Sequence, residues 1–249
     1  MTPTGGIRPT RVASLSLALV ALLAAIPATA AETAAEGPGI RTLYLVRHGA
    51  YDEQDPRDEA VGRGLTAVGV AQSKLLAARL RALPFRFDEI VASPLTRARE
   101  TAATIVADLG AGPARILPDL AECTPPTRRR DIMAREKPED LAACTAQLER
   151  LATSLFAPSR HGDRHELVVC HGNVTRWLVT RALGVDPDSW LGMSIGHASV
   201  TVLRVDAEGG LRVLAVGDVG HLPANLQTGR LDDPERSLEP PAATPPAPR

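Results

Sequence analysis

The sequence TLYLVRHG, residues 42–49, joins a short apolar run to the tripeptide Arg47-His48-Gly49. The run over residues 42–46 is bounded by turn and charge signals, which predicts a buried β-strand. A second strongly apolar run, residues 167–170, closes on His171-Gly172 and predicts another buried strand. Two buried strands that each end on a His-Gly pair are the first indication of a sheet with polar groups at its carboxyl ends.

The rest of the chain alternates predicted helices and strands. Thr66, Ser93 and Asn173 are good N-caps, and Pro94 suits a first helical position. The predicted helices cover residues 66–83, 93–110, 138–156 and 173–184. The further predicted strands cover residues 87–92, 114–117, 200–205 and 211–216. A loop that contains proline and arginine is predicted over residues 124–137. This alternation predicts an α/β fold of three layers, a mainly parallel sheet flanked by helices on both faces with an antiparallel edge hairpin.

Length and composition fit one soluble domain preceded by an export segment. The 249 residues are 44% hydrophobic and 23% charged, with a formal net charge of -1. Residues 1–30 carry two arginines before an uncharged run, then small residues at Ala28 and Ala30, as a cleaved signal peptide requires. Extended to Ala31, the uncharged run has 20 residues, enough for an uncleaved membrane anchor instead.

The folded domain is predicted over residues 41–228 and outside the cytoplasm in either case, as a periplasmic, secreted or membrane-anchored protein. Residues 229–249 carry six prolines without apolar periodicity and are predicted to be disordered. The 28 basic and 29 acidic residues balance and only 3% of residues are aromatic, so no nucleic-acid partner is expected. A membrane is a partner only if the N-terminal segment is uncleaved.

Polar groups gather where the predicted strands end, and ligands of open parallel sheets bind beyond the carboxyl ends of the strands. Three such ends carry Arg47-His48-Gly49, residues 93–97 and His171-Gly172-Asn173. We expect them to meet at one crevice that collects two histidines, two arginines and a helix N-terminus. All of these can donate hydrogen bonds to an anion, and a phosphoryl group meets that demand best.

Several of these stretches resemble one known family. RHG at 47–49, LTAVG at 65–69, SPLTRA at 93–98 and VCHG at 169–172 resemble the histidine phosphatase (phosphoglycerate mutase-like) superfamily, over residues 41–228. Within it, WLGMS at 190–194 and VGDVG at 216–220 are most similar to the mitochondrial mutase-like serine/threonine protein phosphatases. Residues 123–127 depart from the mutase pattern and no Arg-x-Pro follows residues 47–49, so neither mutase nor phytase activity is implied.

The resemblance implies roles for individual residues. His48 is implied as a nucleophile that forms a phosphohistidine without a metal or other cofactor, and a neutral imidazole nitrogen can attack phosphorus. Arg47, Arg97 and His171 are implied as ligands of the phosphoryl oxygens. Glu122 is the expected general acid and base, since relatives place their acid after the third strand; Asp119 on the same loop is the alternative.

Other residues have two interpretations. Gly172 is expected to bind substrate, and His197 either touches substrate or is structural. The run Arg128-Arg129-Arg130 is either a solvated charge run or overhangs the pocket and favours acidic substrates. The remaining histidines near the predicted domain, His161, His165 and His221, are expected to be structural.

Three cysteines, Cys123, Cys144 and Cys170, cannot form a disulfide framework and allow at most one bridge. They are expected to be unpaired, partly buried side chains. The alternative is a bridge between Cys123 and Cys170, which each neighbour an expected catalytic residue, acting as a redox brake in an oxidising compartment.

The leading hypothesis is an exported, metal-independent phosphomonoester hydrolase that works through phosphohistidine at His48. Its substrates are phosphoproteins or small periplasmic phosphate esters. Two alternatives stay open: a binding module that keeps the anion pocket without turnover, and a phosphatase of envelope sugar or lipid phosphates.

Overall fold

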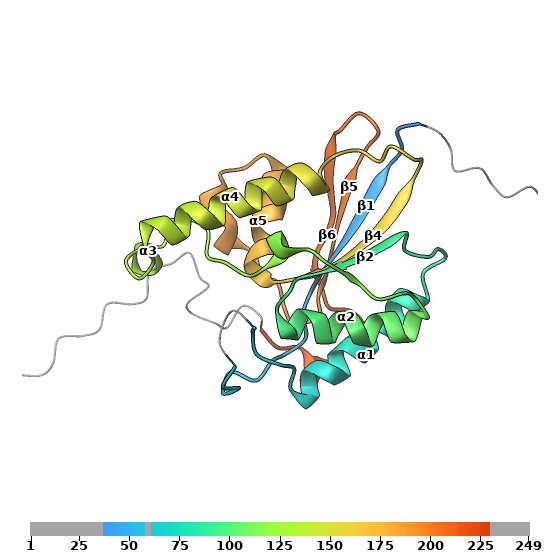
Figure 1. The fold of residues 1–249 in the computed structure, drawn as a ribbon, viewed down its shortest axis with the longest axis horizontal. Coiled ribbons are helices and arrows are strands. Elements are labelled where there is room, and N and C mark those ends of the chain that lie inside the picture. The colour runs from blue at the N-terminus through green and yellow to red at the C-terminus, as the bar shows by residue number, and fades with distance from the viewer. Residues whose placement is uncertain (1–36, 58–60, 230–249) are drawn as a thin grey trace, which may run out of the picture. The chain divides into compact units, whose positions relative to one another are not determined.

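The computed structural model describes residues 37–57 and 61–229, and its centre is a six-stranded sheet of order β3-β2-β4-β1-β5-β6 (Figure 1). The strands are β1 (Arg41–Arg47), β2 (Glu89–Ala92), β3 (Arg115–Ile116), β4 (Arg164–Cys170), β5 (Val200–Val205) and β6 (Leu211–Asp218). The first four in this order pair in parallel, and β5 and β6 add an antiparallel hairpin at one edge. The predicted sheet is confirmed.

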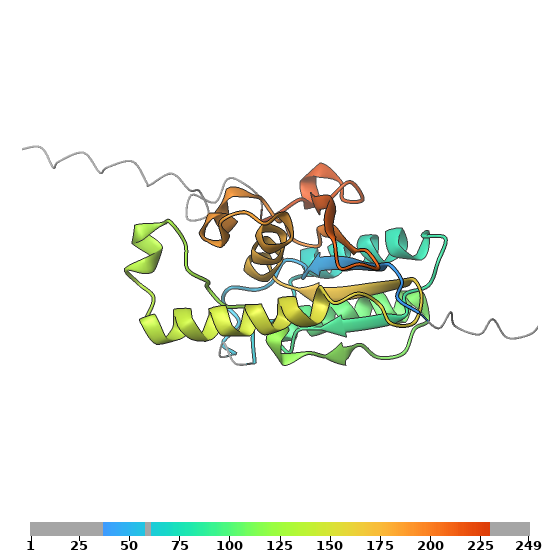
Figure 2. The same cartoon turned by 90° about the horizontal axis from the view of Figure 1, so that it is seen from above.

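Within the described residues, five α-helices and three 3-10 helices connect or follow these strands. They are α1 (Ala67–Arg81), α2 (Thr96–Leu109), η1 (Pro118–Leu120), α3 (Arg130–Met133), α4 (Pro138–Leu155), α5 (Gly172–Leu183), η2 (Pro187–Gly192) and η3 (Ala224–Leu226). The short α3 lies within the stretch 124–137 that the sequence predicts as a loop, beside the N-terminal end of α4 (Figure 2). The predicted bounds of the longer helices hold to within a few residues.

Side chains of the central strands alternate between two hydrophobic cores, one on each face of the sheet. Leu43 and Leu45 of β1 belong to a core that α4 and α5 cover. Val46 of the same strand belongs to a core that α1 and α2 cover. The three-layer prediction is therefore confirmed.

The N-terminus of α1 packs directly on the chain that follows β1. Thr66 is the N-cap, as predicted, because its Oγ1 accepts a hydrogen bond from the Gly69 amide at 3.1 Å. The Thr66 amide donates to the Ala50 carbonyl at 3.0 Å. A Cβ at Gly69 would lie 1.9 Å from the Ala50 carbonyl oxygen, so only glycine permits this approach. These contacts hold the chain that follows His48 against the N-terminal end of α1.

Two other predicted N-caps are wrong. The N-cap of α2 is Leu95, and the hydroxyl of Ser93 instead lies 2.7 Å from His171 Nε2. The N-cap of α5 is His171, and the Asn173 side chain instead donates to the Cys123 carbonyl at 3.2 Å. Both polar side chains have partners on distant segments, and Ser93 Oγ also accepts a hydrogen bond from the Leu95 amide at 3.3 Å, before the helix begins.

The cysteines form one bridge, the maximum predicted, but it joins a pair that the sequence did not suggest; of the three thiols expected to be unpaired, Cys170 is unpaired. Cys123 and Cys144 form a disulfide, with Cα atoms 5.7 Å apart and a sequence separation of 21. Closing a loop of this length removes unfolded-state entropy worth about 3 kcal/mol. Cys170 is a buried free thiol 3.4 Å from Thr175 Oγ1, and burial raises its pKa to about 12. Cys170 is therefore held as an unreactive thiol on the core side of β4.

Two predicted segments lie outside the described residues: the signal peptide or anchor at 1–30 and, apart from Gly229, the tail at 229–249. No helix within 37–57 and 61–229 combines the length and apolar character needed to cross a membrane.

Candidate active site

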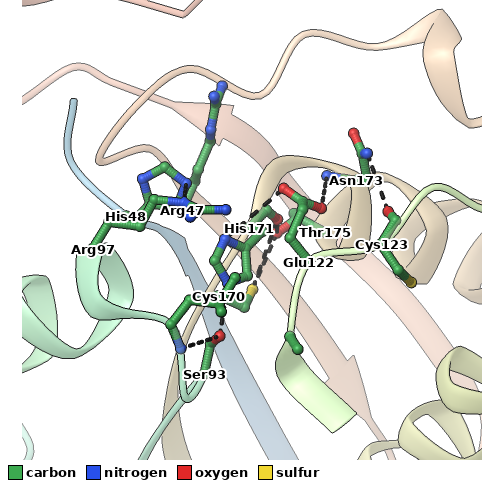
Figure 3. A network of polar contacts seen from close by, with 12 residues as sticks. Arg47, His48, Ser93, Arg97, Glu122, Cys123, Cys170, His171, Asn173 and Thr175 are labelled. Carbon is green, nitrogen blue, oxygen red and sulfur yellow. Dashed lines mark hydrogen bonds and ion pairs between the residues drawn. The ribbon is translucent and has the colours of Figure 1, made fainter. Parts of the chain in front are cut away.

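The three polar strand ends meet as predicted. The His48 amide donates to the Cys170 carbonyl at 3.0 Å, which joins the chain after β1 to the end of β4. The Ser93 amide donates to the Val169 carbonyl at 2.9 Å, which joins the chain after β2 to the same strand. The ring centroids of His48 and His171 lie 5.0 Å apart at this junction (Figure 3).

The His48 imidazole is held as one tautomer. Its Nδ1 lies 2.7 Å from the Gly49 carbonyl oxygen, which can only accept, so Nδ1 carries the hydrogen. Its Nε2 then has a free electron pair, which accepts a hydrogen bond from Arg97 Nε at 3.0 Å. Burial, followed by the nearby charges of His171, Arg47, Arg97 and His197, holds the pKa of His48 well below its usual range. The imidazole is therefore neutral, with an electron pair on Nε2.

Two arginines place positive charge beside this atom. Arg97 is the second residue of α2, and its guanidinium also lies 4.9 Å from the ring centroid of Tyr51. Arg47 is 3% exposed at the end of β1, where it donates to the Ile195 carbonyl at 2.6 Å. The other terminal nitrogen of Arg47 lies 3.0 Å from His197 Nε2. Both guanidinium groups are thus held in fixed positions near His48.

His171 also contributes a ring nitrogen to the surroundings of His48. Its Nε2 is bound to Ser93 Oγ, whereas its buried Nδ1 has no hydrogen-bond partner among the described residues. The carboxylate oxygen Glu122 Oε2 lies 3.9 Å from this Nδ1. Burial, then the charges of Arg97 and Arg47, lowers the pKa of His171 well below its usual range. His171 is therefore a neutral group next to His48 and Glu122 (Figure 3).

The geometry separates the two candidate acids. Glu122 follows η1, and its Oε1 accepts a hydrogen bond from the Asn173 amide at the start of α5, at 3.2 Å. Asp119 points instead to α4, where its carboxylate lies 2.8 Å from Arg150 Nη2. Glu122 therefore lies beside His171, and Asp119 does not.

A cavity of about 300 Å³ opens at this cluster. It is lined by Tyr51, Gly62, Arg63, Leu95, Arg97, Glu122, Cys123 and Thr124. Two larger cavities, of about 680 and 570 Å³, are lined by none of the predicted site residues. The small cavity is lined by two of the predicted site residues, Arg97 and Glu122.

Tyr51 and Arg63 were missed by the sequence interpretation. The Tyr51 ring lies 5.4 Å from the His48 ring, measured between centroids. The only signal was position: Tyr51 is three residues from His48 and is one of two tyrosines in the chain. Arg63 comes just before the LTAVG stretch, but nothing in its neighbours marks it as a cavity residue.

The residues with two interpretations are also placed. His197 joins the cluster, with its ring centroid 5.6 Å from that of His48. Gly172 is the buried first residue of α5, directly after His171. Arg128 pairs with Asp186 outside the cavity lining. Arg129 is 3% exposed and bound to Asp131, so the arginine run does not line the cavity.

The other histidines have structural neighbours. His165 stacks on Phe85 with ring centroids 3.7 Å apart, and His221 lies 3.1 Å from an Arg79 nitrogen. Across residues 37–57 and 61–229, no group of three or more His, Cys, Asp or Glu side chains is placed to hold a metal ion.

The low pKa values of His48 and His171 predict acid sensitivity of the fold. In the unfolded chain both imidazoles titrate near pH 6.5, whereas in the folded protein they bind protons only at lower pH. Between those values the unfolded state binds more protons, so acidification favours unfolding. We expect the free energy of unfolding to fall by up to about 1.4 kcal/mol per pH unit for each histidine below pH 6.5.

Urea titrations between pH 7.5 and pH 5 measure this slope. His48→Asn is expected to reduce it, while the same change at the exposed His161 leaves it unchanged. A free energy of unfolding that stays constant from pH 6.5 to pH 5 would contradict the buried neutral state of both rings.

Comparison with known proteins connects this geometry to a family. The chain is 35% identical over 190 residues to "Serine/threonine-protein phosphatase Pgam5, mitochondrial" of Caenorhabditis elegans, an overlap of 74% of this chain and 65% of that protein. It is 34% identical over 199 residues to the protein of the same name from Drosophila grimshawi, covering 77% and 68% of the two chains. The chain thus spans about two thirds of the length of these relatives.

A solved structure, the putative alpha-ribazole-5'-P phosphatase of Escherichia coli, has the same fold. It superposes with a TM-score of 0.58 at 21% identity, over 72% of this chain and 97% of that one. The profile of the histidine phosphatase superfamily (branch 1) matches residues 43–127 and 126–218, which include every strand of the sheet except the start of β1. With its paired His-Gly strand ends and the matched profile, the chain belongs to branch 1 of the histidine phosphatase superfamily.

Proposed function

We propose that the protein is a metal-independent phosphomonoester hydrolase that forms a phosphohistidine at His48. The observation that carries this proposal is the neutral His48 imidazole, whose Nε2 electron pair faces Arg97 while Nδ1 is held by the Gly49 carbonyl. Arg97, Arg47 and His171 surround this atom with donors where the phosphoryl oxygens of the transition state carry charge. The family membership and the names of the relatives also support hydrolysis.

The reaction proceeds in two steps. In the first, His48 Nε2 attacks phosphorus, the ester P–O bond breaks, and Glu122 delivers a proton to the leaving oxygen. The phosphoryl oxygens take over the hydrogen bond that Arg97 makes to Nε2. In the second step, water attacks phosphorus, Glu122 takes a proton from that water, and the P–N bond breaks. Inorganic phosphate leaves and Nε2 regains its electron pair.

The proposal is tested by assaying the folded protein, with EDTA present, against para-nitrophenyl phosphate, phosphopeptides, sugar phosphates and nucleotides. We expect hydrolysis that EDTA does not reduce. Loss of activity in EDTA would overturn the metal-independent mechanism. Phosphate binding without any product release would instead identify the non-catalytic binding module.

For the substrate, we propose phosphoserine and phosphothreonine in proteins. The names of the relatives support this class, and the cavity leaves the site accessible from the surface. Arg63 lines the cavity and makes no hydrogen bond or ion pair with any residue the structure describes, so it favours substrates with a second negative group. Small phosphate esters, including envelope sugar and lipid phosphates, are the competing outcomes of the screen.

Export of the protein is likewise a proposal. The Cys123–Cys144 disulfide supports it, because disulfides persist in oxidising compartments. Mass analysis of the purified protein distinguishes a cleaved signal peptide from an uncleaved membrane anchor. A mature chain starting at Ala31 or Glu32 excludes the membrane anchor, and an intact N-terminus excludes the cleaved signal.

Glu122→Gln is expected to slow the first step more strongly when the leaving group is a stronger base. Phenolate is about as basic as the tyrosine side chain, with a pKa of about 10, and needs protonation, whereas para-nitrophenolate is a much weaker base. We expect kcat/KM to fall about 100-fold for phenyl phosphate and less than about 10-fold for para-nitrophenyl phosphate. Asp119→Asn is the matched control, and the opposite result for the two variants would make Asp119 the acid.

A further inference from the structure

Three side chains of α4 contact the segment that carries Glu122. They are Cys144, Gln147 and Arg150, spaced three residues apart. Residues three apart on a helix are neighbours on its surface, so the three form a continuous row. We call residues 119–123 the acid segment and these three side chains the α4 row.

Each member of the α4 row has a partner in the acid segment. Gln147 Nε2 donates to the backbone carbonyls of Asp119 and Ala121, at 3.0 and 2.8 Å. Arg150 pairs with the Asp119 carboxylate, and Cys144 is bonded to Cys123. Residues 119, 121 and 123 are thus all attached to α4.

Glu122 lies between two of these attached residues, and its side chain points toward α5 (Figure 3). Its Oε1 accepts from the Asn173 amide at 3.2 Å, and its Oε2 lies 3.9 Å from His171 Nδ1. The Asn173 side chain also donates to the Cys123 carbonyl. The acid segment is therefore held from α4 on one side and from the start of α5 on the other.

We propose that the α4 row positions Glu122 for proton transfer, so that reduction of the Cys123–Cys144 disulfide lowers the enzyme's rate on basic leaving groups. This inference rests on the proposed function of Glu122. Gln147 and Arg150 do not line the cavity and act through the backbone of the acid segment, so they are positioning residues. A displacement of about 1 Å in a reacting group is enough to cost up to about 100-fold in rate.

A small reductant can reach the Cys123–Cys144 disulfide through the cavity. Cys123 lines the active-site cavity, whereas Cys144 is 3% exposed in the core. A small dithiol that enters the cavity transfers two electrons and two protons to the disulfide. It leaves two protein thiols and is itself oxidised to a disulfide. The acid segment then loses its covalent attachment to α4 at the residue next to Glu122.

The experiment compares kcat/KM for phenyl phosphate and para-nitrophenyl phosphate, since kcat/KM covers only the steps up to phosphoryl transfer to His48. Gln147→Met removes both donors while keeping the length of the side chain. We expect it to lower kcat/KM about 10-fold for phenyl phosphate and less than about twofold for para-nitrophenyl phosphate. Glu149→Gln on the same helix, which loses only its pair with Arg181, is the matched control and leaves both values unchanged.

Dithiothreitol is expected to produce the same selective loss in the wild-type enzyme. It should have no effect on the double variant Cys123→Ala, Cys144→Ala, which retains Cys170 as a control for other thiol effects. If that double variant does not fold, Gln147→Met still tests the α4 row without touching a cysteine. Equal losses on both substrates, or no loss, would overturn the proposal.

A double-mutant cycle separates positioning from general stability. In the Glu122→Gln background, Gln147→Met is expected to cost no further activity, because the proton donor is already absent. Additive losses would show that Gln147 acts independently of Glu122 and would overturn the inference. Failure of the proposed function looks different: His48→Ala would then still hydrolyse both substrates.

Discussion

Replacing His48 by alanine is expected to lower kcat by about 10⁴-fold or more, because loss of an enzymatic nucleophile removes the covalent route altogether. The substitution deletes the neutral, buried ring nitrogen that accepts a hydrogen bond from Arg97. Phosphate binding is expected to persist, since Arg47, Arg97 and His171 remain. Turnover of para-nitrophenyl phosphate measures the loss, and phosphate affinity measured by calorimetry checks that the site is intact.

The covalent intermediate gives this prediction a second readout. Rapid quenching of the wild type during turnover is expected to yield a phosphorylated peptide that contains His48, and His48→Ala yields none. His161→Ala, at an exposed histidine, is the control and should retain full activity. A phosphorylated peptide containing His171 in place of His48 would show that the nucleophile has been assigned to the wrong ring.

Arg97→Ala is expected to lower kcat/KM by about 10³- to 10⁵-fold, the range found for arginines that stabilise a transferring phosphoryl group. Arg97 is also one of the charges that lower the pKa of His48. Its removal should therefore raise that pKa, so the acid limb of the kcat/KM profile moves to higher pH. Arg97→Lys keeps a charge but not the forked geometry, and an intermediate activity is expected.

The control for Arg97 is its neighbour Arg99, which is exposed on the same helix. Arg99→Ala should leave both kcat/KM and its pH profile unchanged. A loss of less than about 10-fold in Arg97→Ala would place the transition-state charge elsewhere, with Arg47 as the remaining guanidinium beside His48.

Much of the fold was predictable because its signals are local. The strands β1 and β4 are apolar runs that are buried on both faces, and such runs are visible without any knowledge of their neighbours. The N-cap at Thr66 was predictable for the same reason, since its partner Gly69 is three residues away. The caps predicted at Ser93 and Asn173 failed because their side chains have partners on segments that are distant in sequence.

The same distinction between local signals and contacts of distant segments applies to the candidate site. A parallel sheet brings the ends of its strands together, so the meeting of His48, Arg97 and His171 follows from the order of strands and helices. Glu122 and Asp119 could not be ranked from the residues alone, because both lie in the short connection between β3 and α3, where no local pattern fixes the direction of a side chain. The path of that segment depends on its contacts with α4, including the ion pair that Arg150 makes with Asp119.

The α/β layering, the family and the strand ends on which the chemistry depends could all be inferred from the sequence, since apolar periodicity and short motifs are properties of neighbouring residues. The folded structure was needed to establish the tautomer of His48, the partner of Cys123 and the presence of Tyr51 in the cavity. Each of these depends on the direction of a side chain or the route of a loop. Both are set by packing between segments far apart in the chain, and no local pattern records that packing.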